Sequence, residues 1–183
     1  MKIVITGGPH SGKTTLIAAL SEYGITVPEP AARVIRRERL LSENSRYYEP
    51  TYPWNDYPAF CPKVMIESVR LESRLNDDPE EFFFLDRSLI DTLAYARLNG
   101  EVKLVQDEHI EDWIDHANYS EAFICDPVGE YTATDIRSET EEEAKRTHSI
   151  IRQTYEEYLP PTTLPAVPVE ERVNIILRRL KLI

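Results

Sequence analysis

Cysteine and long apolar runs are both scarce in this sequence of 183 residues. The only two cysteines, Cys61 and Cys125, stand far apart with no histidine or cysteine at a metal-ligand spacing, which indicates reduced core residues rather than a disulfide or a zinc site. No run approaches the ~18 apolar residues of a membrane span. Residues 1–6 lead directly into glycines and a lysine, unlike a signal peptide. We therefore expect a soluble, cytoplasmic protein with no membrane partner.

Basic residues are outnumbered by acidic ones. The chain has 21 Lys and Arg against 32 Asp and Glu, for a formal net charge of −11. A surface of this sign repels a phosphate backbone, so we expect no nucleic-acid partner. Any phosphate-binding group must then be concentrated locally. The length predicts one domain, residues 1–183.

Glycine is also scarce, and three of the six glycines fall in one short segment. The segment Gly7-Gly8-Pro9-His10-Ser11-Gly12-Lys13-Thr14 fits the G-x-x-x-x-G-K-[ST] pattern of a P-loop without a mismatch. Its backbone N–H groups would form an anion cradle at the start of a helix. Lys13 would reach the β- and γ-phosphates and Thr14 would bind Mg²⁺. The expected nucleotide-binding residues are Gly8, Pro9, His10, Ser11, Gly12, Lys13, Thr14 and Thr15.

Short apolar segments alternate with helical periodicity along the rest of the chain. Strands are predicted over residues 2–6, 25–27, 82–85, 121–125 and 162–167. Helices are predicted over residues 13–22, 31–41, 63–75, 89–98, 101–117, about 138–158 and 169–180, with a Ser138–Glu141 capping box before the sixth. The prolines of residues 43–62 argue against any helix or strand there. This pattern predicts an α/β three-layer sandwich, with a five-stranded parallel sheet covered by helices on both faces.

Charged residues follow the predicted strands at the edge where the strand ends converge. Asp86 is expected, with Thr14, at the metal, and Glu29 is expected to accept a proton from an acceptor hydroxyl. Arg87 and Arg137 would neutralise charge on a transferring phosphoryl group. Alternatively, Glu29 is a solvated turn residue and the two arginines form surface salt bridges.

These motifs resemble those of a known group of proteins. The loop over residues 7–15, Pro28-Glu29-Pro30 and Asp86-Arg87-Ser88 are similar to motifs of deoxynucleoside and nucleoside monophosphate kinases. Residues 29–34, 84–94 and 168–173 extend the likeness over most of the chain to the NadR-type P-loop ATPase/kinase family, which includes nicotinamide riboside kinase domains. The resemblance implies that Glu29 is a catalytic base and that Arg87 contacts the acceptor. It leaves the substrate open, because the family contains both kinases and proteins described only as nucleotide-binding, and because no nicotinamide-specific signature is present. The expected lid supplies only Arg137, whereas deoxynucleoside kinases usually carry several arginines there.

Together the motifs favour a phosphotransferase that uses ATP (or GTP) and Mg²⁺ to phosphorylate a hydroxyl of a small, nucleoside-like acceptor. Residues 43–62 are expected to bind the acceptor, with Tyr47, Trp54, Tyr57 and Phe60 as candidates to stack on its ring; alternatively, these aromatics only pin the loop to the surface. Residues 127–137 are expected to form a lid. The alternative is an ATPase or a GTP-binding regulatory protein without such an acceptor. Asp126-Pro-Val-Gly129 imitates a GTPase element, although no N-K-x-D motif for guanine occurs.

Two further features are predicted to be structural. Arg33, Arg36, Arg37 and Arg39 cluster on one expected helix, where they would form a solvated face that pairs with Glu38 and Glu43. Alternatively, Arg33 and Arg37 (or Arg36) share a face that is directed at a substrate phosphate. Arg33 is the one among them expected nearest to Glu29. His148 falls on the apolar stripe of another expected helix and is interpreted as a packing residue.

Overall fold

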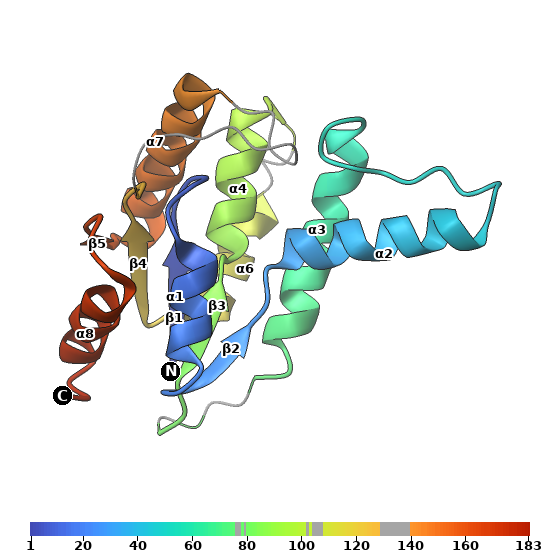
Figure 1. The fold of residues 1–183 in the computed structure, drawn as a ribbon. Helices are drawn as coiled ribbons and strands as arrows, with labels where there is room; N and C mark the ends of the chain where they lie inside the picture. The colour runs from blue at the N-terminus through green and yellow to red at the C-terminus, as the bar shows by residue number, and fades with distance from the viewer. Residues whose placement is uncertain (76–77, 79, 102, 104–107, 129–139) are drawn as a thin grey trace.

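A parallel five-stranded sheet forms the centre of the molecule (Figure 1). The computed structural model describes residues 1–75, 78, 80–101, 103, 108–128 and 140–183. The strands are β1 (Lys2–Thr6), β2 (Ile25–Val27), β3 (Phe83–Asp86), β4 (Glu121–Cys125) and β5 (Thr162–Leu164), in the spatial order β2-β3-β1-β4-β5. Strand β1 pairs with both β3 and β4, with Ile5 opposite Asp86 and Phe123. The segments that follow these three strands therefore meet at one edge of the sheet.

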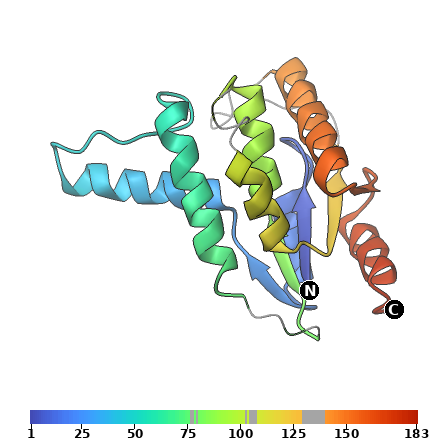
Figure 2. The same cartoon turned by 180° about the vertical axis from the view of Figure 1, so that it is seen from behind.

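Helices cover both faces of this sheet, which confirms the predicted three-layer α/β sandwich. On one face lie α1 (Lys13–Leu20) and α8 (Val169–Arg179), and on the other lie α4 (Leu89–Leu98), α6 (Glu108–Ala117) and α7 (Glu141–Tyr158) (Figures 1 and 2). Alternation along β1 explains the two layers, because Ile3 and Ile5 pack under α1 and α8 whereas Val4 packs under α4 and α7.

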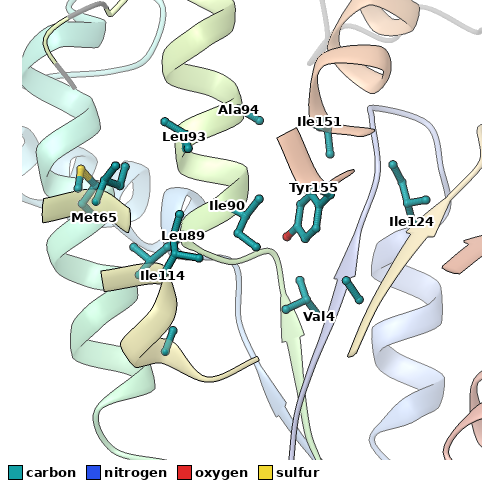
Figure 3. Packing of buried hydrophobic residues seen from close by; sticks show 13 residues of the cluster. Val4, Met65, Leu89, Ile90, Leu93, Ala94, Ile114, Ile124, Ile151 and Tyr155 are labelled. Atoms are coloured by element: carbon teal, nitrogen blue, oxygen red, sulfur yellow. The ribbon is translucent and has the colours of Figure 1, made fainter. Parts of the chain in front are cut away.

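The second of these layers contains a buried tyrosine. Tyr155 of α7 is fully buried within the cluster that Val4, Ile90, Ile124 and Ile151 also join (Figure 3). Its ring contributes apolar area to the core, while its hydroxyl needs a hydrogen-bond partner at that depth. That partner belongs to the candidate site described below.

Helix α3 (Tyr57–Glu72) corrects the prediction that residues 43–62 hold no regular structure. It lies beside α2 (Pro30–Asn44), and the pair extends away from the sheet (Figure 1). Pro58 lies in the first turn, where a backbone N–H has no helical partner to lose. Pro62 lies inside the helix and removes only one main-chain hydrogen bond. The Asp56 carboxylate caps the helix by accepting from the Ala59 N–H at 3.1 Å.

The start of α7 corrects the expected capping box. The box is formed by Thr140 and Glu143, two residues after the predicted pair, with the Glu143 N–H donating to Thr140 Oγ1 at 3.2 Å. Ser138 lies outside the described residues. Both pairs fit the same S/T-x-x-E pattern, so the sequence alone does not distinguish them.

Candidate functional site

The P-loop joins β1 to α1 at the carboxyl edge of the sheet. Gly12 has a φ of 74°, in the left-handed region that favours glycine, and ends the loop at the N-terminus of α1. Gly8 passes so close to α7 that an added Cβ would lie 2.9 Å from the Cβ of His148. These constraints hold the loop curled around the start of the helix, which is the geometry that binds phosphate.

The Lys13 side chain folds back over the P-loop that precedes it. Its Nζ donates to the carbonyl oxygens of Gly7 and Gly8 at 2.9 and 3.0 Å, and to Ser11 Oγ at 3.2 Å. Burial, together with the charge of Arg87, lowers the pKa of Lys13 to about 8. An anion beside this ammonium would offset both effects, since it favours the charged form.

Arg87 joins the ends of β2 and β3 to α4. Its Nε donates to Glu29 Oε1 at 3.1 Å and its Nη1 donates to Asp91 Oδ1 at 3.0 Å. The guanidinium also lies 5.2 Å from the centroid of the Tyr95 ring. Glu29 remains 34% exposed, whereas Asp91 is only 2% exposed. The sequence-predicted pair Glu29 and Arg87 is thus brought together, with the glutamate still accessible.

Asp91 is the hub of this network and was not predicted from the sequence. Its carboxylate accepts hydrogen bonds from Thr6 Oγ1 at 2.5 Å, the Ser88 N–H at 2.9 Å and the Tyr155 hydroxyl at 2.5 Å, besides that from Arg87. Burial raises the pKa of Tyr155, which keeps its hydroxyl a donor. The only local signal for Asp91 was its position three residues after the helix N-cap Ser88, as in a capping box.

Asp86 and Thr14 are the residues that fit a divalent metal ion. One carboxylate oxygen of Asp86, Oδ1, is buried and has no hydrogen-bond partner among the described residues. Burial, together with the charge of Glu29, raises the pKa of Asp86 to about 6. Thr14 is exposed at the start of α1 and lines the same cavity. A bound cation would supply the partner that the Asp86 oxygen lacks, because Mg²⁺ takes carboxylate and other oxygen ligands.

A cavity of about 800 Å³ brings these groups together. It is lined by loop residues 9–15, by Glu29, Asp86 and Arg87 at the strand ends, by Pro53, Trp54 and Tyr57, and by Tyr95, Leu98, Asn99 and Val128. The lining therefore combines phosphate-binding groups with aromatic rings. The volume lies within the range of small-molecule sites.

The aromatic segment is only partly in this cavity. Trp54 stacks on Tyr52 with ring centroids 4.8 Å apart, and Trp54 and Tyr57 line the cavity. Phe60 is buried under α2 instead, and Tyr47 is 84% exposed beside Arg46. Of the aromatic candidates, Trp54 and Tyr57 are thus the ones placed to contact a ligand here.

Two side chains from distant parts of the chain, Arg172 and His148, form hydrogen bonds with the backbone of the P-loop. Arg172 of α8 is 2% exposed and donates to the carbonyl oxygens of Ser11, Asp126 and Pro165. His148 of α7 was interpreted as a packing residue, yet its Nδ1 accepts a hydrogen bond from the Gly8 N–H at 3.3 Å. Burial lowers the pKa of His148, which favours the neutral imidazole that can accept this bond.

Two arginines of the α2 cluster form ion pairs with a buried glutamate of the neighbouring helix α3. Arg33, Arg37 and Arg70 each form an ion pair with Glu67 of α3, whose side chain is 2% exposed. The nearer expected partner, Glu38, accepts instead from Lys63 at 2.9 Å. None of these side chains lines the cavity. Arg33 contacts the site through its backbone, whose N–H donates to the Glu29 carbonyl oxygen at 3.3 Å.

Part of the expected site cannot be placed. Arg137 and the other residues of the expected lid from 129 onward (129–137) lie outside the described residues. Of that lid, Val128 lines the cavity, and its N–H donates to the His10 carbonyl oxygen at 2.9 Å. Asp126, the first residue of the GTPase-like element, accepts from Arg152 at 3.3 Å and lies 3.7 Å from His148 Nε2.

Comparison with known proteins agrees with this fold. The family model of the AAA domain matches residues 2–172. The NadR protein crystallised with NAD and AMP-PNP is similar in fold, with a TM-score of 0.66 at 17% identity over 97% of this chain and 48% of that one. Deoxyadenosine kinase from M. mycoides with bound dCTP matches over the whole of both chains, with a TM-score of 0.54 and 17% identity.

A third similar structure is thymidylate kinase from Ehrlichia chaffeensis, with a TM-score of 0.59 and 16% identity over 99% of this chain and 98% of that one. The chain spans less than half the length of the NadR chains that it matches. No protein of curated function matches the sequence significantly. These likenesses show a P-loop kinase-like fold. Within the described part of the chain, no helix has the length and apolarity needed to cross a membrane.

Proposed function

We propose that this chain, which belongs to the AAA domain family, is a P-loop phosphotransferase. It would move the γ-phosphoryl group of ATP (or GTP) to a hydroxyl of a small, nucleoside-like acceptor. One observation carries the proposal. A single cavity is lined by the P-loop, by the Glu29–Arg87 pair and by the aromatic side chains of Trp54 and Tyr57. A protein that only bound and hydrolysed a nucleotide would not need the aromatic rings in the lining of this cavity.

The phosphate-binding groups of the cavity orient the nucleotide. Backbone N–H groups of residues 10–15 and the N-terminus of α1 receive the phosphate oxygens. The Lys13 ammonium exchanges its three loop acceptors for β- and γ-phosphate oxygens, which also compensates its burial. Arg87, whose side chain is 10% exposed, adds a fixed positive charge at the strand ends. The positive groups stabilise the charge that spreads over the transferring group.

The metal would be held between α1 and β3. The protein would contribute two oxygen ligands, Thr14 Oγ1 and Asp86 Oδ1. The Asp86 oxygen has no hydrogen-bond partner among the described residues. Mg²⁺ bound there supplies charge neutralisation on the β- and γ-phosphates. The Asp86 carboxylate, desolvated and next to Glu29, is better stabilised as an anion when a cation is present.

Glu29 acts on the acceptor. As the acceptor hydroxyl oxygen forms its bond to the γ-phosphorus, the bond from that phosphorus to the bridging oxygen breaks, and the nucleoside diphosphate leaves with the electron pair. Glu29 takes the hydroxyl proton. Its ion pair with Arg87 fixes the orientation of the carboxylate, and its partial exposure leaves an oxygen available to the acceptor.

The acceptor class follows from the aromatic lining and from the similar structures. The flat ring of the acceptor stacks on Trp54 or Tyr57, and the acceptor hydroxyl faces Glu29. Structures of NadR with NR and of deoxyadenosine kinase with dCTP support a nucleoside-like acceptor. The one-domain organisation over residues 1–183, the acceptor-binding role of residues 43–62, the lid at about 127–137 and the charge-stabilising role of Arg137 complete this proposal.

The proposal is tested by release of ADP and GDP, with Mg²⁺, against a panel of nucleosides, nicotinamide riboside and nucleoside monophosphates. Release that rises with one acceptor and is lost in a Lys13→Ala protein supports a kinase and identifies its substrate. Slow release that is indifferent to every acceptor contradicts the proposal and favours an ATPase or a nucleotide-dependent switch.

A further inference from the structure

A second pocket, of about 400 Å³, lies between α3 and α6 and shares no described lining residue with the nucleotide cavity. Figure 2 shows α3 and α6 near one another, on the sheet face opposite α1. Its walls are mainly apolar and come from Ile66, Val69, Leu89, Trp113 and Ala117. The volume is sufficient for a small organic molecule.

One buried carboxylate belongs to the wall of this pocket. Glu72, at the end of α3, is 6% exposed. Its Oε1 accepts a hydrogen bond from the Tyr119 hydroxyl at 3.0 Å, and that hydroxyl in turn accepts from the Leu89 N–H at 3.1 Å. These bonds fix the orientation of the carboxylate. Its second oxygen, Oε2, is buried without a hydrogen-bond partner among the described residues.

The lysine in the described pocket wall forms no ion pair with this carboxylate, although its charge favours the ionised form. Lys2 also lines the pocket, but its Nζ donates to the Ala117 carbonyl oxygen at 2.8 Å, and no ion pair joins it to Glu72 among the described residues. Burial raises the pKa of Glu72 to about 7. A buried carboxylate with an unused oxygen is unfavourable unless a donor or a cation completes it.

The apolar wall is open to solvent as well. Ile66, Val69 and Trp113 are 65%, 41% and 43% exposed, although they lie on neighbouring helices. An aromatic or aliphatic body against them would remove apolar surface from water. The face of an indole ring also attracts cations.

We propose that this pocket binds a small organic amine, with its ammonium group beside the Glu72 carboxylate and its apolar body packed against Ile66, Val69 and Trp113. The charge complementarity between a buried carboxylate and an ammonium group selects this class over anions of the same size. The net charge of −11 raises the local concentration of cations in the same direction. The site is separate from the nucleotide cavity and does not depend on the proposed phosphoryl transfer.

The two tryptophans of the chain provide a direct test, because Trp54 lines the nucleotide cavity and Trp113 lines this pocket. In a Trp54→Phe protein all tryptophan emission comes from Trp113. Titration with benzylamine is expected to change that emission saturably, with a dissociation constant on the order of 1 mM. Benzoate, which has the same ring and the opposite charge, is expected to cause no saturable change.

Two variants identify the group that binds. Glu72→Gln in the same background keeps the size of the side chain and an acceptor for Tyr119, and is expected to weaken benzylamine binding by about tenfold or more. Ile66→Lys changes an exposed side chain at the rim, so folding is retained, and is expected to weaken binding by at least about threefold. Sedimentation velocity of each protein shows its oligomeric state.

Three results would overturn the proposal. The first is the absence of a saturable response to benzylamine in the Trp54→Phe protein. The second is equal binding of benzylamine by the parent and by both variants. The third is Trp113 emission that depends on protein concentration rather than on amine, with self-association in sedimentation, which would mean that a second copy of the chain covers this surface.

Discussion

Arg87 connects three acidic residues that come from different strands and helices. It pairs with Glu29 and Asp91 and follows Asp86 directly in the chain. Its φ of 72° lies in the left-handed region, which costs a non-glycine residue about 1–3 kcal/mol unless the surroundings hold it. The Asp91 network supplies that constraint. The guanidinium is consequently fixed among the phosphate-binding groups of the cavity before any ligand binds.

The proposed base gives the first prediction at this scale. Glu29→Gln is expected to lower kcat by about 10²–10⁴-fold, because the amide cannot take the acceptor proton. Nucleotide affinity is expected to change by no more than about threefold, because Glu29 belongs to the acceptor side of the reaction. Steady-state kinetics and nucleotide titration measure the two effects. The same substitution at the exposed Glu22 is the control, and unchanged turnover in Glu29→Gln would remove the base role.

The buried carboxylate of Asp91 gives the second prediction at this scale. Asp91→Asn is expected to lower the free energy of unfolding by about 2–4 kcal/mol, because it removes the buried charge that pairs with Arg87 and that accepts hydrogen bonds from Thr6 and Tyr155. Urea unfolding measures the change. Asp112→Asn, at a side chain that is 70% exposed, is expected to stay within about 0.5 kcal/mol of the parent. Similar stabilities of the two variants would show that the network contributes little.

Single residues differed in how well the sequence predicted them. Lys13 and Thr14 follow from a local motif, and Glu29, Asp86 and Arg87 follow from the rule that parallel strands end at one edge. Arg172 and His148 act on the P-loop from positions more than a hundred residues away, and no local pattern carries that information. Asp91 looked like an ordinary residue of the first turn of a helix, because its bonds to Thr6 and Tyr155 exist only after folding.

At the scale of elements, the alternation of strands and helices was correct, whereas boundaries near prolines and caps were not. The prediction treated every proline of residues 43–62 as a helix breaker. The cost of a proline depends instead on its position, because the first-turn N–H groups of a helix have no partner inside it. Two adjacent S/T-x-x-E patterns likewise left the start of α7 undetermined until Thr140 and Glu143 were seen to bond to one another.

This explanation of α3 predicts opposite behaviour for its two prolines. Pro62→Ala is expected to stabilise the protein by about 1 kcal/mol, because the new alanine supplies an N–H that reaches the carbonyl oxygen of Pro58, and because position 62 is exposed. Pro58→Ala is expected to change stability by less than about 0.5 kcal/mol, since its N–H would have no helical partner. Urea unfolding of both proteins makes the comparison. Equal effects would mean that α3 does not begin at Tyr57.

The molecule has two separate regions of buried charge. The carboxyl edge of the sheet collects Lys13, Asp86 and Arg87 in the nucleotide cavity, and the pocket between α3 and α6 contains Glu72. Both regions place buried charge in a protein of formal net charge −11. Such groups reduce stability in the free protein and gain partners when a ligand binds.

Glu72 makes the stability depend on pH. Its pKa is raised by burial from 4.5 to about 7, so the folded state holds a proton that the unfolded state has released across that window. The stability of the parent protein therefore falls as pH rises through it. Gln does not titrate, so Glu72→Gln is expected to gain about 1–3 kcal/mol relative to the parent between about pH 5.5 and about pH 8.

Urea unfolding of both proteins at the two pH values measures this gap. Any cost of placing the glutamine amide in the pocket is the same at both values and cancels. A gap that stays constant, or that closes as pH rises, would contradict a raised pKa for Glu72.

The central claim is that the γ-phosphoryl group is transferred to an acceptor hydroxyl in the cavity of the P-loop, Glu29 and Arg87. Mass spectrometry of the acceptor after incubation with nucleoside triphosphate and Mg²⁺ tests it most directly, with ADP or GDP quantified in the same sample. We expect a phosphorylated acceptor in equal amount to the diphosphate, and neither product from the Lys13→Ala protein. Diphosphate released together with free phosphate, with every acceptor unmodified, would contradict the claim.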